Sequence, residues 1–507
     1  MVVKLASADL AGIVAQPVTV EVDISDGLST FNIVGMPDTA IKESRDRIRA
    51  AVKNSGFSFP GRRVTVNLAP ADLKKESSRI DVPIALGILS ASGSFLKREH
   101  LKEKLFIGEL SLDGKARPVN GVLSMAMMAR DQGLQLVIPE ENFAEARAVR
   151  NLDLVPYRSL NQLVRMLTGK EEPAIPDVER EMETQDYPVR MEDVRGQEHA
   201  KRALVIAAAG NHNVLMYGPP GSGKSMLAKA LPAILPDMSH DEEIETTMIH
   251  SAGGLLSDTG ILSVRPYRAP HHTISHIGLI GGGTRLNPGE VSYAHNGVLF
   301  LDEFPEFPRR TLEVLRQPME DGVVRISRAS GSVTFPSRFL LIAAMNPCPC
   351  GFFGSDEREC TCSPTRISNY RSRISGPLLD RIDLLVHVPQ IPLEQMMEPP
   401  AASDSRSLRK QVNRARSRQQ DRSACPNAYL SEPDLKQVCR MSHEAEELLL
   451  RAARNMKLSS RSFNRVLKVA RTIADLQSEP SEILPVHVAE ALQFKLSDFF
   501  TTELTYD

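Results

Sequence analysis

Eight consecutive residues near the middle of the chain have the types and spacing of a phosphate-binding loop. They are Gly218, Pro219, Pro220, Gly221, Ser222, Gly223, Lys224 and Ser225. The apolar residues 214–217 before them predict a buried strand, and residues 226–231 after them predict a helix. Glycines let a backbone approach phosphate oxygens closely. We therefore expect Lys224 to reach the β- and γ-phosphates of ATP and Ser225 to bind Mg²⁺.

Two further apolar stretches end in polar residues that complete such a site. Val298–Leu301 is followed by Asp302 and Glu303, which is a Walker B pattern. We expect Asp302 to hold Mg²⁺ and Glu303 to polarise the attacking water. The stretch 339–345 ends at Asn346, whose amide can orient that water as a sensor 1 residue. An ordinary buried strand ending in solvated acids is the alternative, and the neighbouring phosphate loop argues against it.

The pattern of apolar residues divides the chain into three units. Residues 1–168 contain predicted strands at 18–24, 31–34 and 64–68 with helices between them, which indicates an α+β domain. A charged, proline-punctuated linker follows at 169–188. The α/β ATPase core covers 189–392, and residues 393–507 form a helical domain.

Composition limits where the protein works and what it can bind. The 507 residues are 42% hydrophobic and 24% charged, with a net charge of −2, so any nucleic-acid site must be local. No apolar run is long enough to span a bilayer, and the N-terminus does not resemble a signal peptide. We therefore expect a cytoplasmic protein without membrane contact, and six cysteines without a disulfide framework.

Four of the six cysteines form a cluster with the spacing of a candidate zinc site. Cys348 and Cys350 form one CxC pair, and Cys360 and Cys362 form a second. Four thiolates can close a tetrahedral zinc site. Four free buried thiols or a redox pair are the alternatives.

Several arginines lie where they could contact phosphates. Arg381, in the run 376–383, could complete the active site of a neighbouring subunit as an arginine finger. Arg325 and Arg328 lie in a predicted hairpin at 323–335, between the Walker B and sensor 1 strands. Residues 406–422 hold seven basic residues on a predicted helix. Contact with DNA phosphates and a solvated surface are both open for these two segments.

Several runs resemble the ComM/YifB-type magnesium-chelatase-like AAA+ ATPases. They are RGQEHAKRALVIAAAGNHNVLMYGPPGSGKS, RPYRAPHHTISHIGLIGGG, PGEVSYAHNGVLFLDEFPEF and GPLLDRIDL. The resemblance implies an N-terminal domain similar to the Lon/ribosomal-S5 fold, a AAA+ core with a helix-2 insert at 274–290, and a C-terminal helical lid. It also implies that Arg461 or Arg465 is the sensor 2 residue at the nucleotide, and that Arg328 grips DNA at the hairpin tip.

The family further implies a homo-hexameric ring that uses ATP and Mg²⁺ to move along single-stranded and branched DNA. Such a motor drives branch migration in homologous recombination and natural transformation. Two alternatives remain open: the ATPase subunit of a magnesium chelatase, and an ATP-dependent protease or unfoldase. Chelatase ATPase subunits typically lack a large domain before the phosphate loop, and no proteolytic dyad is evident.

Overall fold

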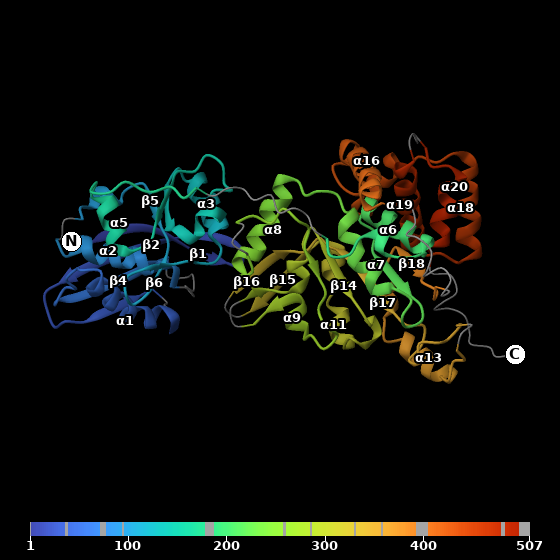
Figure 1. The fold of residues 1–507 in the computed structure, drawn as a ribbon, viewed down its shortest axis with the longest axis horizontal. Coiled ribbons are helices and arrows are strands. Elements are labelled where there is room, and N and C mark those ends of the chain that lie inside the picture. Colours follow the sequence, from blue (N-terminus) through green and yellow to red (C-terminus); the bar gives the residue numbers. More distant parts are fainter. Residues whose placement is uncertain are drawn as a thin grey trace.

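The computed structural model describes residues 2–35, 39–70, 78–93, 96–177, 187–256, 260–283, 286–328, 331–355, 358–391, 404–477 and 482–495. Three parts lie in a row in Figure 1: an N-terminal mixed α/β part, a central part built on a parallel sheet, and a helical C-terminal part. Of the predicted linker, residues 178–186 lie outside the described residues.

A seven-stranded mixed sheet forms the N-terminal part, with strand order β3-β4-β2-β1-β5-β8-β9. The predicted strands and helices of this part are present, because alternating apolar residues such as Val18, Val20 and Val22 bury one face. The strands of the sheet are β1 (Val3–Ala11), β2 (Val14–Ser25), β3 (Phe31–Val34), β4 (Arg63–Ala69), β5 (Lys104–Phe106), β8 (Gln135–Pro139) and β9 (Leu154–Tyr157). The short strands β6 (Glu109–Leu110) and β7 (Ala116–Arg117) pair with each other outside it. Its helices are α1 (Thr39–Asn54), α2 (Asp81–Ala91), α3 (Val122–Asp131), α4 (Phe143–Ala146) and α5 (Leu160–Leu167).

A parallel five-stranded sheet with order β11-β14-β17-β10-β18 forms the centre of the ATPase core. Its central strands are entirely apolar and buried, as expected where helices cover both faces of a sheet. The strands are β10 (Val214–Tyr217), β11 (Tyr267–Arg268), β14 (Val298–Leu301), β17 (Leu340–Met345) and β18 (Leu384–His387). The helices are α6 (Glu198–Gly210), α7 (Lys224–Ala230), α8 (His240–Ala252), α11 (Arg309–Glu313), α12 (Arg316–Asp321), α13 (Pro364–Arg371) and α14 (Gly376–Leu379).

Two smaller features are attached to this sheet. The segment predicted as an insert contains a short helix and a two-stranded ribbon: α9 (His276–Ile280), β12 (Gly281–Gly282) and β13 (Asn287–Pro288). Another short helix, α10 (Glu290–Tyr293), begins at its last residue. The predicted hairpin is present as β15 (Val323–Arg328) and β16 (Gly331–Pro336), which pair antiparallel. Its base is closed by Ser337, whose amide donates to the carbonyl of Gly322 at 2.8 Å.

In the C-terminal part, every described element longer than one turn is a helix. These are α16 (Ser405–Ser423), α17 (Glu432–Val438), α18 (His443–Asn455), α19 (Ser460–Leu476) and α20 (Pro485–Gln493). No helix within the described ranges has the length and apolar character needed to cross a lipid bilayer.

Several basic side chains of helix α16 form hydrogen bonds and ion pairs with neighbouring parts of the protein. Arg416 donates to the carbonyl of Ala208 at 2.8 Å, and Arg418 donates to the carbonyl of Asp475 at 2.6 Å. Arg422 forms an ion pair with Asp475 at 2.8 Å, and Arg409 pairs with Asp237. Four of the seven basic residues in 406–422 therefore fix the helix to its neighbours, which favours packing over DNA contact for this segment.

The N-terminal part is joined to the core through a buried polar contact. Ser251 on α8 accepts a hydrogen bond from the amide of Gly121 at 2.9 Å and donates to the carboxylate of Glu145. Glu145 also accepts from the amide of Leu123 at 2.7 Å. Burial raises the pKa of Glu145 to about 7, although these two hydrogen bonds oppose the shift. A carboxylate at this interface thus costs stability when it ionises.

We predict that Glu145→Gln stabilises the protein at pH 8 and has little effect at pH 4.5. Because the folded pKa lies above the ordinary value of 4.5, the native protein loses stability as the pH rises from 4.5 through 7. The difference should reach on the order of 3 kcal/mol, from 1.36 kcal/mol per pKa unit. Thermal or urea unfolding at both pH values measures it, with the exposed Glu141→Gln as the control. A Glu145→Gln curve parallel to wild type at both pH values contradicts this account.

Candidate functional site: a nucleotide site at the edge of the parallel sheet

The phosphate loop follows β10 and leads into α7, as its sequence predicts. Gly221 and Gly223 have φ values of +76° and +92°, and a Cβ at either position would meet nothing within 4 Å. The backbone at these two glycines therefore faces open space, and its positive φ values suit glycine. This is the cradle that a polyphosphate needs.

Lys224 is buried in this loop and held by backbone carbonyls. Its Nζ donates to the oxygens of Gly218 at 2.8 Å and Pro219 at 2.7 Å. Burial lowers its pKa to about 8, and the charge of Asp302 opposes that shift. A buried, incompletely compensated ammonium gains from a phosphate partner, so the residue fits a nucleotide.

The residues that should serve Mg²⁺ and water meet beside this lysine. Ser225 Oγ donates to Asp302 Oδ2 at 2.7 Å, and Asn346 Oδ1 lies 3.4 Å from Lys224 Nζ. Asp302 follows β14 and Asn346 follows β17, and parallel pairing brings both strand ends to the edge where the loop lies. Hydroxyl and carboxylate oxygens are ligands that Mg²⁺ prefers. The arrangement fits Mg²⁺ together with ATP.

Glu303 contacts His272, one of two adjacent histidines for which the sequence favours a structural role over metal binding. His272 Nδ1 lies 2.9 Å from Glu303 Oε2, and its ring stacks against His271 with centroids 4.1 Å apart. Glu303 itself has a φ of +52°, which turns it out of the strand direction. Adjacent histidines after a short strand are a visible signal, but only the fold brings them to the Walker B glutamate.

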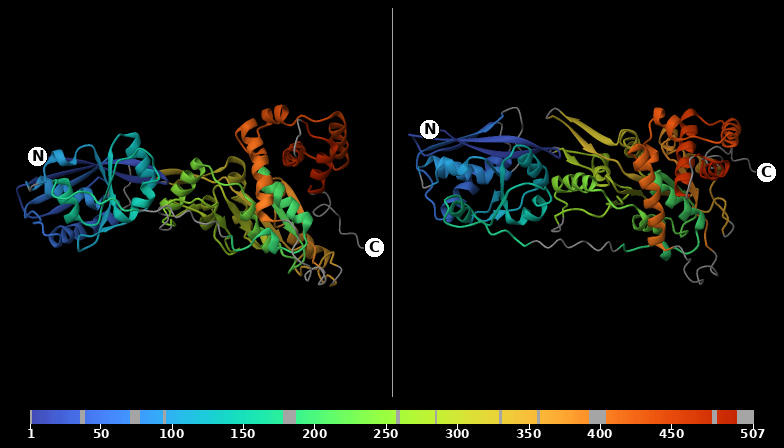
Figure 2. Two further views of the ribbon diagram at one scale, coloured as in Figure 1. Left: turned by 45° about the horizontal axis from the view of Figure 1, so that its top comes forward. Right: turned by 90° about the horizontal axis from the view of Figure 1, so that it is seen from above.

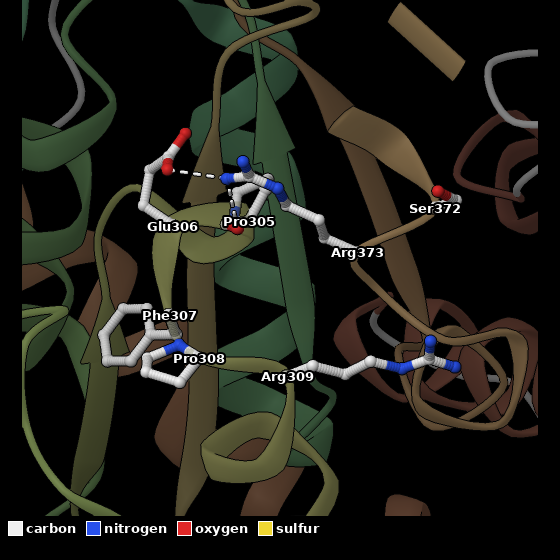
Figure 3. Close-up of a pocket in the computed structure, with 7 residues that line it drawn as sticks. All are labelled: Pro305, Glu306, Phe307, Pro308, Arg309, Ser372 and Arg373. Carbon is white, nitrogen blue, oxygen red and sulfur yellow. Dashed lines mark hydrogen bonds and ion pairs between the residues drawn. The ribbon is translucent and has the colours of Figure 1, made fainter. Parts of the chain in front are cut away.

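Two other features near the site also come from the structure. Gln197 Nε2 donates to the carbonyls of Ser222 at 3.2 Å and Pro389 at 2.6 Å, so it ties the phosphate loop to the end of β18. A pocket of about 500 Å³ lies just beyond Glu303. Figure 3 shows Arg373 pointing toward Glu306, which it meets at 2.7 Å, while Arg309 points away from that pair. The lining residues are Pro305, Glu306, Phe307, Pro308, Arg309, Ser372 and Arg373, none from the phosphate loop.

The arginine-finger candidate Arg381 and the sensor 2 candidate Arg465 lie near the N-terminal ends of the parallel strands, opposite the phosphate loop. Arg381 donates to the carbonyl of Pro377 at 2.7 Å and pairs with Glu320. Arg465 lies 3.6 Å from Asp383, which bonds the amide of Asn213 just before β10. Since β10 has four residues and strands rise about 3.3 Å per residue, these ends are about 13 Å from the phosphate loop.

Arg461, the other sensor 2 candidate, is exposed on the first turn of α19, near the same group. The hydrogen bond from Arg381 lowers the pKa of Glu320, and the charge of Arg461 adds to that shift. The structure therefore gathers Arg381, Arg461 and Arg465 together and away from their own chain's phosphate loop.

The four clustered cysteines converge as metal ligands would. Their Sγ atoms all lie within 4.8 Å of one another, and three pairs are separated by 3.3, 3.5 and 3.6 Å. Zinc–sulfur bonds of about 2.3 Å give a tetrahedron with edges of about 3.8 Å, close to these separations. All four are free thiols. The donor set fits zinc.

This cysteine cluster adjoins the nucleotide site. Cys348 comes two residues after Asn346, and a Cβ at Gly351 would lie 2.7 Å from Cδ of Pro220 in the phosphate loop. Arg371 packs beside the cluster. It donates to the carbonyl of Pro347 at 3.1 Å, and its Cζ lies 5.1 Å from the centre of the Phe353 ring. The cysteine cluster thus lies directly beside the phosphate loop and Asn346.

Comparison with known families identifies the chain in three segments. Residues 190–396 match "Magnesium chelatase, subunit ChlI", residues 20–142 match "Subunit ChlI of Mg-chelatase", and residues 402–495 match its C-terminal region. Competence protein ComM of Haemophilus influenzae is 43% identical over 490 residues, covering 96% of this chain and 95% of that protein. The chain belongs to the ComM/YifB-type magnesium-chelatase-like proteins.

Other relatives separate this type from the chelatases themselves. The uncharacterized protein YifB of Escherichia coli is 41% identical over 494 residues, covering 96% of both chains. The magnesium-chelatase 38 kDa subunit of Rhodobacter capsulatus is 28% identical over 169 residues, which cover 30% of this chain and 48% of that subunit. Membership of the ComM/YifB type, with the assembled Walker residues, supports an ATPase.

We predict one zinc ion per chain in protein purified without chelator, as measured by elemental analysis. Replacement of Cys348, Cys350, Cys360 and Cys362 by serine should abolish it, because serine hydroxyls do not replace thiolates as zinc ligands. Cys425→Ser, outside the cluster, is the matched control and should keep its zinc. Equal zinc in the four-serine variant and wild type contradicts the assignment.

Proposed function

We propose that this protein is the subunit of a ring-shaped ATPase that moves along single-stranded and branched DNA and drives branch migration. The observation that carries the proposal is the position of the β15–β16 hairpin between the Walker B strand β14 and the sensor strand β17. Nucleotide hydrolysis at Asp302, Glu303 and Asn346 can move such a hairpin through very little intervening chain.

The exposed face of the hairpin suits a nucleic-acid backbone. Arg325 is exposed on it, and Arg328 holds the last paired position before the tip, opposite Gly331. Of Arg328 the structure describes the strand position alone. Guanidinium groups bind phosphate without reading sequence, which suits a motor that must move along any DNA. The name of the Haemophilus relative, a competence protein, agrees with work on incoming DNA in the cytoplasm.

The same proposal extends to fold details and assembly. We assign the N-terminal part to the Lon/ribosomal-S5-like domains, the core to AAA+ ATPases with a helix-2 insert at 274–290, and α16–α20 to the helical lid. We propose a homo-hexamer in which Arg381 acts on a neighbour's nucleotide. Its support is that Arg381 and Arg465 lie near the N-terminal ends of the parallel strands, and that the length of β10, about 13 Å, separates these ends from the phosphate loop.

We expect wild-type protein to branch-migrate a synthetic four-way junction in the presence of MgATP, and Glu303→Gln protein to bind but not process it. Arg328→Ala should keep basal ATPase activity, lose stimulation by DNA, and lower the salt slope of DNA binding by about one phosphate per chain. Lys410→Ala, an exposed basic residue on α16, is the control and should change neither. ATPase activity that responds to a chelatase partner or to unfolded protein, and not to junctions, favours the corresponding alternative.

We also expect Arg381 to act on a neighbour's nucleotide. Mixing Arg381→Ala with Lys224→Ala subunits should recover ATPase activity, because an interface can then combine an intact loop with an intact finger. Random 1:1 assembly restores about a quarter of the interfaces, which sets the expected rate. Each variant alone is the baseline, and co-assembly is checked by native mass spectrometry. No recovery in mixed rings rules out action in trans.

A further inference from the structure

The turn between β1 and β2 of the N-terminal part packs against the hairpin β15–β16. Gly12, with a φ of +68°, lies so close to Val333 that a Cβ would overlap its Cγ1, and the ring of Phe335 is 3.4 Å from the same point. Ile13 is 5% exposed and belongs to the apolar cluster of the ATPase core. Figures 1 and 2 show β1 and β2 reaching toward the hairpin from the N-terminal side.

The hairpin has two faces of opposite character. Val324, Ile326, Val333 and Phe335 are buried or half-buried on one face, while Arg325, Ser327, Ser332 and Thr334 are exposed on the other. An isolated two-stranded ribbon is at best marginally stable in water, so it depends on what covers its apolar face. That face packs into the apolar cluster of the ATPase core, and the turn at Gly12 and Ile13 adds a contact at Val333 and Phe335, while Arg325 stays exposed.

The turn itself is held in place by the N-terminal part and by α8. Ser124 on α3 donates to the carbonyl of Ile13 at 2.6 Å, and the amide next to α3, that of Gly121, donates to Ser251 on α8 at 2.9 Å. Ile244 and Met248 on α8 pack into the apolar cluster of the N-terminal part. One connected set of contacts therefore runs from α8 through α3 to the turn.

The core in turn fixes α8. Thr246 Oγ1 accepts a hydrogen bond from the side-chain amide Nδ2 of Asn296 at 3.2 Å, and His250 Nε2 lies 2.9 Å from the backbone carbonyl of Tyr293. Asn296 and Tyr293 precede the Walker B strand β14 directly. The N-terminal part is thus attached to a rigid segment of the core at α8 and touches the hairpin at a second point.

We propose that the N-terminal part is a brace that sets the position of the hairpin, with Gly12 and Ile13 as the positioning residues. Because the turn packs on the apolar face at Val333 and Phe335, it helps to set the position at which the exposed face with Arg325 is presented to DNA. The effect of this brace on DNA rests on the proposed function. The contact of Gly12 and Ile13 with the hairpin does not depend on DNA.

Hydrogen–deuterium exchange of the amides in 323–336 tests the contact without DNA. Ile13→Asp places a charge in an apolar cluster and should release the hairpin, with exchange faster by roughly tenfold or more. Val14→Asp changes the adjacent residue, which is 53% exposed, and should leave exchange as in wild type. Ile13→Leu should restore protection. Unchanged hairpin exchange in folded Ile13→Asp protein overturns the brace.

The functional consequence is measured on the same variants. Ile13→Asp should keep basal ATPase activity, since it lies outside the nucleotide site, and should lose most stimulation by junction DNA. A merely structural defect would lower both rates together, and that outcome also overturns the brace. If wild type shows no response to DNA while Ile13→Asp still releases the hairpin, the DNA function is wrong and the brace stands. Gly12→Val, which forces Val333 aside, should reproduce the Ile13→Asp exchange pattern if aspartate prevents folding.

Discussion

The structure depends on the parallel pairing of β10, β14 and β17. Parallel strands end at the same edge of a sheet, so the phosphate loop, Asp302 and Asn346 meet although 128 residues separate the first loop residue from Asn346. The strands β14 and β17 are buried on both faces, as expected for a parallel sheet. The same direction of the strands places Asp383 and its arginine neighbours at the opposite edge. One constraint thus gathers the nucleotide-site residues at one end of the strands and Asp383 with its arginines at the other.

Contacts within the protein hold two of the reactive groups of the nucleotide site. Lys224 is satisfied by carbonyls, and Glu303 is engaged by His272. The cysteine cluster adjoins the same loop, because its Gly351 turn lies against Pro220 and its first cysteine follows the strand that ends at Asn346.

The hairpin links this chemistry to the N-terminal part. Its strands connect α12 to β17, its apolar face meets Gly12 and Ile13, and its polar face carries Arg325. The hairpin therefore packs one face against the protein and exposes the other to solvent. The buried Glu145–Ser251 contact makes the attachment of that domain sensitive to pH between 4.5 and 7.

The sequence by itself determined the local elements and the chemical groups. Strong apolar runs and the glycine-rich loop specify β10, β14, β17 and the loop, because backbone conformation and burial depend there on nearby residues. It also indicated the hairpin and the four cysteines as a group. Only the tertiary structure decided what these groups face: His272 on Glu303, Arg381 and Arg465 at the far edge, and the α16 arginines on carbonyls and Asp475. Such contacts join residues tens to hundreds of positions apart, and the packing of whole elements, which local spacing does not encode, sets them.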